Sequence, residues 1–207
     1  VKVSEPIVVY REAINGNNVG GAFEGKSPNR HNRFYIEVEM LPQNVVDSLR
    51  AGDFRDGTIR NKDQKEIGDQ FAELGMDKDM MRKGYAISGT NVFINGTKGI
   101  QGLHETRELL IEGFNEVCKS GPLAGEPAMG MLVRLTDAKL HEDAIHRGPA
   151  QTIPAMRNAM RGAMVRAGTT MMEPMQKLYV SVPNDWLGGV TREVTQRRGV
   201  IEDMPAD

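Results

Sequence analysis

The sequence of 207 residues contains one cysteine, Cys118, and one tryptophan, and aromatic residues make up only 5% of it. A lone cysteine can form neither an internal disulfide nor a thiolate metal cluster, which favours a reducing compartment. No stretch approaches the roughly 18 consecutive apolar residues that a membrane span needs. Residues 1–10 also lack the features of a signal peptide. We therefore expect a cytoplasmic protein with no membrane partner.

A strong charge imbalance is also missing, because 26 Lys and Arg face 28 Asp and Glu, for a net charge of -2. This balance opposes a protein that holds nucleic acid by bulk electrostatic attraction. Contact confined to one small surface remains compatible with it. The 13 methionines outnumber the 11 aromatic residues, so we expect a core filled partly by flexible thioether side chains.

Hydrophobic periodicity predicts an α+β fold. Alternation of period two, or a run of β-forming residues, predicts four strands, over residues 6–14, 34–40, 85–94 and 131–136. Spacing of 3.6 residues predicts two longer helices, over 103–118 and 152–167. Residues 15–32 are rich in Gly and Asn and are expected to form one long loop. Residues 45–83 alternate in charge sign and predict short exposed helices.

The last residues restart this pattern on a smaller scale. A strand is expected at 178–182, a short helix at 186–194 and a second strand at 199–202. Such a βαβ unit needs a third or fourth strand to be stable. We therefore expect it to pack against the preceding domain, to be disordered, or to cause self-association through its open edge.

A phosphate-binding motif is matched in full by residues 20–27, Gly-Gly-Ala-Phe-Glu-Gly-Lys-Ser. Alone, it would indicate a nucleotide-binding enzyme. A phosphate loop must, however, lead into a helix whose N–H groups hold the phosphate, and here Pro28-Asn29 and an expected strand follow. We interpret the match as coincidental and keep a nucleotide-binding enzyme as a rival hypothesis.

His141 and His146 flank an acidic pair in a pattern that superficially resembles a zinc-protease motif. Their spacing of five residues would place them about 140° apart on a helix, so one metal ion could not bind both from one face. We expect a polar loop and no metal site. An exposed imidazole beside Arg147 could instead contact RNA bases, or the loop could be an ordinary surface loop.

The segment Leu140 to Gln151, with its sequence Leu-His-Glu-Asp-Ala-Ile-His-Arg-Gly-Pro-Ala-Gln, resembles the diphthamide loop of the translation elongation factor 2 family. Further segments resemble that family in the same order: Tyr10-Arg11-Glu12, residues 27–33, Lys98-Gly99-Ile100-Gln101, Met172-Glu173-Pro174 and Arg197-Arg198-Gly199. Gly148-Pro149-Ala150 replaces the three glycines of the eukaryotic factor and is similar to the archaeal form.

This resemblance implies a fragment of a larger GTPase. Residues 1–172 would be domain IV, with the ribosomal protein S5 domain 2-like fold, and residues 173–207 would begin a truncated domain V, as a partial ferredoxin-like βαβ unit. The fragment itself would not be an enzyme. It would hold no cofactor, because GTP and magnesium bind a domain of the parent factor that is missing here.

The resemblance also implies a function and a site. Domain IV would enter the decoding centre of the small ribosomal subunit and promote the translocation of tRNA and mRNA. His146 would be the position of diphthamide, and so a substrate of diphthamide-synthesis enzymes and of ADP-ribosylating toxins. The residues expected to contact tRNA or rRNA form two tip loops: Asp143, Ile145, His146, Arg147 and Gly148 in one, and Ser27, Pro28, Asn29, Arg30 and His31 in the other.

Three more specific roles follow for the first of these loops. We expect Asp143 to orient it, Ile145 to anchor it and Gly148 to permit its bend.

The arginines at 157, 161 and 166 line one face of the second long helix. We interpret them as a solvated or salt-bridged face, with RNA contact as the alternative, since no aromatic residue lies between them. A generic interaction domain without a ribosomal role is the second rival hypothesis.

Overall fold

A computed structural model describes residues 4–5, 7–16 and 21–204 of the chain. The chain divides into two units, Val1–Pro174 and Met175–Asp207. The first unit contains all of the described β-structure. Its elements position both of the expected tip loops.

A mixed six-stranded sheet forms the centre of the first unit, in the strand order β2-β3-β7-β6-β5-β4. Its strands are β2 (Phe23–Lys26), β3 (Arg33–Met40), β4 (Gly57–Thr58), β5 (Gly84–Ser88), β6 (Asn91–Asn95) and β7 (Met131–Lys139). Only the pairing of β6 with β7 is parallel. A separate antiparallel ladder joins β1 (Arg11–Ile14) to β8 (Thr169–Met172).

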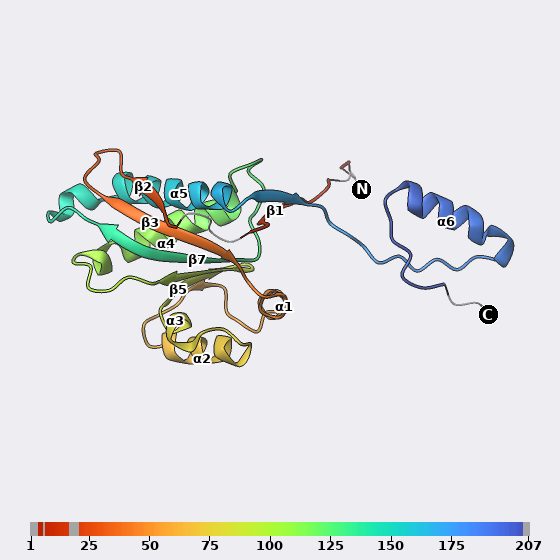
Figure 1. The fold of residues 1–207 in the computed structure, drawn as a ribbon, viewed down its shortest axis with the longest axis horizontal. Helices are drawn as coiled ribbons and strands as arrows, with labels where there is room; N and C mark the ends of the chain where they lie inside the picture. Colours follow the sequence, from red (N-terminus) through yellow and green to blue (C-terminus); the bar gives the residue numbers. More distant parts are fainter. Residues whose placement is uncertain (1–3, 6, 17–20, 205–207) are drawn as a thin grey trace. The chain divides into compact units, whose positions relative to one another are not determined.

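Helices cover both faces of the sheet (Figure 1). One face packs against α4 (Leu103–Lys119) and α5 (Pro149–Arg166), and the other against α1 (Gln43–Ala51), α2 (Gln64–Glu73) and α3 (Lys78–Met81). Neighbouring residues of β7 therefore enter different cores, with Val133 in the first and Leu132 in the second. Within the described ranges, no helix has the length and apolar character needed to cross a membrane.

Several predictions from periodicity are confirmed. β3, α4 and α5 form where the sequence predicted a strand and two helices. The methionine-rich core is also confirmed, since Met156, Met160 and Met164 of α5 are fully buried. α5 begins three residues earlier than expected, with Pro149 in its first turn, where proline is tolerated, and Pro154 therefore lies inside the helix. The mixed sheet with flanking helices is compatible with the α+β class.

The predictions for residues 6–14 and 15–32 need correction. The regular strand covers only Arg11–Ile14, and the expected long loop contains strand β2, which pairs with β3 as a hairpin. Gly25 lies so close to α5 that an added Cβ would be 2.1 Å from the carbonyl oxygen of Ala155. This glycine is needed for close strand–helix packing, although in the sequence it indicated a loop. Residues 17–20 of the expected loop lie outside the described residues.

The expectation of merely exposed helices in residues 45–83 was also incomplete. Their charged residues do face solvent, but their opposite faces form a second hydrophobic core with β5, β6 and β7. Phe54 and Phe71 stack there, with ring centroids 4.1 Å apart. Alternating charge indicated only the outer surface of these helices.

The second unit differs from the expected βαβ arrangement. It contains a 3₁₀ turn, η2 (Asn184–Trp186), and the helix α6 (Leu187–Gln196). Among its described residues, 175–204, there is no β-strand and no buried residue. The predicted helix is confirmed, whereas the strands at 178–182 and 199–202 are absent. Two strands without a third partner bury too little surface to form a stable sheet, which explains the difference.

Candidate functional site at the loop tip

The two expected tip loops lie at the same end of the sheet. The hairpin loop of residues 27–32 connects β2 to β3, and residues 140–148 follow β7. Lys26 pairs with Arg33, which in turn pairs with Lys139. The end of β2, the start of β3 and the end of β7 therefore lie together at one end of the sheet. Strand register therefore brings together two loops that are more than 100 residues apart in the sequence (Figure 1).

Local hydrogen bonds shape the hairpin loop. The N–H of Ser27 donates to the carbonyl of Asn32, and the N–H of Arg30 donates to the carbonyl of Ser27. Arg30 has a positive φ of 63°, in the left-handed region that residues other than glycine seldom adopt. The Oδ1 of Asn29 accepts from the Ser27 hydroxyl at 2.5 Å and from the His31 N–H at 3.1 Å. The loop thus has a defined shape that leaves the side chain of Arg30 exposed.

Asp143 organises the second loop. Its Oδ1 accepts from the N–H of Ile145 at 3.1 Å and caps a 3₁₀ turn, η1 (Ala144–Arg147). Its own N–H donates to Nδ1 of His141 at 3.0 Å. These bonds agree with the predicted orienting role of Asp143. A short polar side chain before a turn is well suited to this cap.

Two asparagine amides join the loops at His146. The Nδ2 groups of Asn29 and Asn32 both donate to the His146 carbonyl, at 3.0 and 2.8 Å. The Oδ1 of Asn32 accepts from the N–H of His141 at 3.0 Å. The N–H of Asn29 also donates to Oε1 of Gln151 at 2.9 Å. The loops are therefore one hydrogen-bonded unit, and Asn32 and Gln151 are members that the sequence reasoning missed.

Three imidazoles cluster at this tip. The ring centroid of His146 lies 4.4 Å from that of His141 and 5.4 Å from that of His31, and His31 lies 5.0 Å from His141. The predicted helical separation of His141 and His146 does not apply, because an irregular loop and a 3₁₀ turn connect them. Within the part of the chain that the structure describes, no group of His, Cys, Asp or Glu side chains is arranged to hold a metal ion.

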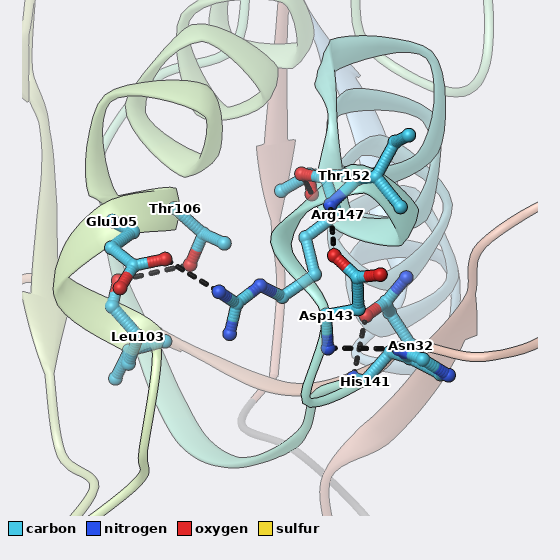
Figure 2. Close-up of polar contacts among 9 residues, drawn as sticks. Asn32, Leu103, Glu105, Thr106, His141, Asp143, Arg147 and Thr152 are labelled. Carbon is cyan, nitrogen blue, oxygen red and sulfur yellow. Dashed lines mark hydrogen bonds and ion pairs between the residues drawn. The ribbon is translucent and has the colours of Figure 1, made fainter.

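Arg147 lies inward, although it was expected among the tip residues that contact tRNA or rRNA. Its side chain is only 7% exposed, and Nη2 bonds to the carboxylate of Glu105 in the first turn of α4 at 2.5 Å (Figure 2). An added Cβ on Gly102 would lie 1.8 Å from Nη1, so this guanidinium packs directly against the start of α4. The Arg147 carbonyl accepts from the Thr152 hydroxyl at 2.8 Å. Arg147 therefore fastens the loop to both long helices.

Two other residue roles are corrected. Ile145 does not anchor the loop, because it is 78% exposed and its side chain faces solvent. Gly148 has φ −65° and ψ 176°, which any residue can adopt, so its bend does not need glycine. Nothing lies within 4 Å of an added Cβ there. The exposed isoleucine is instead available for contact with a partner.

The arginine face of α5 is partly paired. Arg157 forms an ion pair with Glu116 at 2.8 Å, as the salt-bridged interpretation predicted. Arg161 donates to the carbonyl of Ser120, and the guanidinium of Arg166 lies 4.8 Å from the ring centre of Phe23. The sequence did not reveal that an aromatic residue from β2 lies beside this face. Arg161 and Arg166 line a shallow hollow of about 550 Å³, at the opposite end of α5 from the tip loops.

The apparent phosphate-binding motif lacks the structure that a phosphate loop needs. Its described part, residues 21–27, contains β2, and Gly25 and Lys26 lie within that strand. The chain then turns into β3 and not into a helix. The described part of the motif therefore does not lead into a helix whose N–H groups could hold a phosphate, which removes its main physical support.

Comparison with known proteins adds the following similarities. A family model described as elongation factor G, domain IV, matches residues 56–168. Elongation factor 2 of Picrophilus torridus is 55% identical over 204 residues, which is 99% of this chain and 28% of that protein. The corresponding proteins of Methanosphaera stadtmanae and Pyrococcus horikoshii are 50% and 48% identical, over 99% of this chain and 27% of each relative. The chain thus spans little more than a quarter of the length of these relatives.

Proposed function

Because this chain belongs to the elongation factor G domain IV family and is similar throughout to archaeal elongation factor 2, we propose that it is the ribosome-binding part of such a factor. In this proposal, the tip enters the decoding centre of the small subunit and promotes the movement of tRNA and mRNA. The observation that carries the proposal is that hydrogen bonds join the two loops around His146 at one end of the sheet.

The geometry suits insertion into a narrow RNA site. The tip loops extend from β2, β3 and β7, whose inner face packs against α4 and α5, so the loops have a rigid base. Their exposed side chains differ in chemistry, with a cation at Arg30, an aliphatic group at Ile145 and an imidazole at His31. Such groups can contact phosphates, base faces and 2′-hydroxyls without a large basic surface. This explains how a chain of net charge -2 could contact RNA locally.

We further propose that His146 is the position of diphthamide, and hence the target of diphthamide-synthesis enzymes and ADP-ribosylating toxins. Its main chain is held by Asn29 and Asn32, and its side chain is only partly covered. A modified imidazole would extend the tip by a cationic, hydrogen-bonding arm. Arg147 would support this loop from inside, without itself contacting RNA.

The remaining assignments follow from the same family membership. Residues 1–172 would be domain IV, and residues 173–207 would be the start of domain V, completed by parts of the parent factor. GTP and magnesium would bind elsewhere in the parent, so this part would have no catalytic role of its own. The exposed apolar side chains of the second unit, Leu178, Tyr179 and Trp186, would then pack against the rest of domain V or cause self-association.

Ribosome binding by the full-length factor tests this proposal. We expect the double substitution Arg30→Gln plus His146→Ala to weaken binding about tenfold, which corresponds to losing about 1.4 kcal/mol of tip contacts. Arg55→Gln is the matched control, because Arg55 is also exposed but precedes β4, away from the tip loops. Equal co-sedimentation and equal translocation rates for both variants would refute the tip contact.

The modification is tested separately by mass spectrometry of the protein from its native cells. We expect the peptide that contains His146 to be heavier than its sequence mass, with the extra mass located on the His146 ring. His31 and His141 are controls within the same molecule, because their rings lie in the same cluster. An unmodified His146 in native protein would refute the diphthamide assignment.

A further inference from the structure

We propose that Asn32 is a positioning residue for His146, and this role rests on the proposed modification of that histidine. Asn32 was outside the predicted tip residues, yet it is fully buried at the junction of the two loops. By bonding to the main chain on both sides of the junction, it holds the His146 backbone in the conformation that presents the ring to a modifying enzyme.

The hydrogen bonds of Asn32 link both loops at one point. Its Nδ2 donates to the His146 carbonyl at 2.8 Å, and its Oδ1 accepts from the His141 N–H at 3.0 Å. Its backbone N–H and carbonyl both bond to Ser27, which closes the hairpin loop. One side chain thus fixes two positions of the second loop relative to the first.

The chemistry of this position requires an amide. The His141 N–H needs an acceptor, and the His146 carbonyl needs a donor, and asparagine supplies both from one planar group. Aspartate has nearly the same shape but supplies only acceptors when ionised. It would keep the bond from His141 and place an oxygen against the His146 carbonyl. Asn32→Asp therefore removes the proposed positioning bond with little change in volume.

Asn29 is the secondary donor to the same carbonyl. Its side chain is partly exposed and bonds to the second loop at the His146 carbonyl, so it constrains one position of that loop where Asn32 constrains two. Loss of the Asn29 amide should thus act in the same direction as loss of the Asn32 amide, with a smaller effect.

The chain offers a matched control in Asn91, which is also buried, at 1% exposure. Its Nδ2 donates to the Ala128 carbonyl at 2.8 Å, and its Oδ1 accepts from the Met131 N–H at 3.2 Å. Asn91 and Met131 begin β6 and β7, whereas the tip loop follows the end of β7. Asn91→Asp therefore imposes the same chemical change and a comparable structural cost far from His146.

The experiment measures modification of His146 by diphthamide-synthesis enzymes, at a temperature where circular dichroism shows each variant folded. We expect Asn32→Asp to lower kcat/KM roughly 10- to 100-fold, as a small misplacement of a reacting group does. The ¹³C shift of the His146 carbonyl should move in this variant and stay unchanged in Asn91→Asp. Asn91→Asp should be modified at the wild-type rate.

Modification of Asn32→Asp at the wild-type rate, with an altered carbonyl shift, would overturn the positioning role. Equal losses in Asn32→Asp and Asn91→Asp would also overturn it, because destabilisation alone would then explain the effect. If Asn32→Asp does not fold, Asn29→Asp decides: slower modification supports the proposal, and the wild-type rate opposes it. Failure of the wild-type protein to be modified would instead refute the proposed function, and this role of Asn32 with it.

Discussion

Glu12 offers the sharpest test of what holds the first unit together. This glutamate of β1 is fully buried, and its carboxylate accepts three backbone hydrogen bonds from the loop between α4 and β7. Oε2 accepts from Leu123 N–H at 2.9 Å, and Oε1 accepts from Ala124 N–H at 2.8 Å and Glu126 N–H at 3.1 Å. Three N–H groups of the loop therefore bond to this one carboxylate, which ties the loop to β1.

The substitution Glu12→Gln changes one oxygen of this group into an NH₂ donor. The remaining oxygen can keep two bonds, but the NH₂ group would face the Leu123 N–H. Loss of one charge-assisted bond costs about 1.5–3 kcal/mol, and an unsatisfied buried donor costs about 1–3 kcal/mol. A neutral amide is cheaper to bury than a carboxylate, which offsets part of this loss. We expect the free energy of unfolding to fall by about 2–4 kcal/mol.

Urea unfolding followed by far-UV circular dichroism measures this change. The single tryptophan, Trp186, lies in the second unit, so its fluorescence serves as an internal reference that should not respond. Glu108→Gln is the matched control, because Glu108 is exposed on α4. A loss below about 0.5 kcal/mol for Glu12→Gln, the range of ordinary surface substitutions, would refute this reasoning.

Three further predictions concern other contacts. Gly25→Ala should lower stability by about 1–3 kcal/mol in thermal denaturation, because its Cβ would overlap the carbonyl of Ala155; an unchanged Tm would show that α5 can move. A hydrogen bond from Tyr35, and to a smaller extent one from Lys26, holds the pKa of Glu24 below its usual value. Tyr35→Phe should raise that pKa in an NMR titration, and an unchanged value would contradict this cause. The stability that Glu24 contributes is present above its unfolded-state pKa and is lost as pH falls through its folded-state pKa. Burial raises the pKa of the Cys118 thiol, so thiol reagents should label it only after unfolding, and fast labelling of native protein would contradict its burial.

Elements with one buried face could be predicted from the sequence. β3 alternates over eight residues and α4 keeps its helical spacing over 17, so each contains several repeats of its own period. β2 has four residues including a glycine, too few to show a period, and its pairing with β3 decides its structure. In the same way, only tertiary packing reveals that the charged helices after residue 42 cover a second core.

The candidate site could be predicted as two loops, but the details of their contacts could not. His31 and His146 are far apart in sequence, and strand register brings their rings together. The ion pair of Arg147 could not be predicted, because its partner, Glu105, lies 42 residues away in the sequence on another helix. The long-range bonds of Asn32 could not be predicted, because an asparagine in a polar turn usually forms only local hydrogen bonds. Long-range pairing therefore decided which side chains are exposed and which are structural.

Directed radical probing tests the central claim of decoding-centre insertion most directly. Cys118 is buried, and Ile145 is exposed at the tip, so Ile145→Cys can carry a tethered iron chelate in a full-length factor without other accessible cysteines. Val165→Cys, exposed near the other end of α5, is the control. On ribosomes, we predict cleavage of small-subunit decoding-centre RNA from position 145 and a different pattern from position 165. Absence of decoding-centre cleavage from position 145, or identical patterns from both positions, would contradict the account.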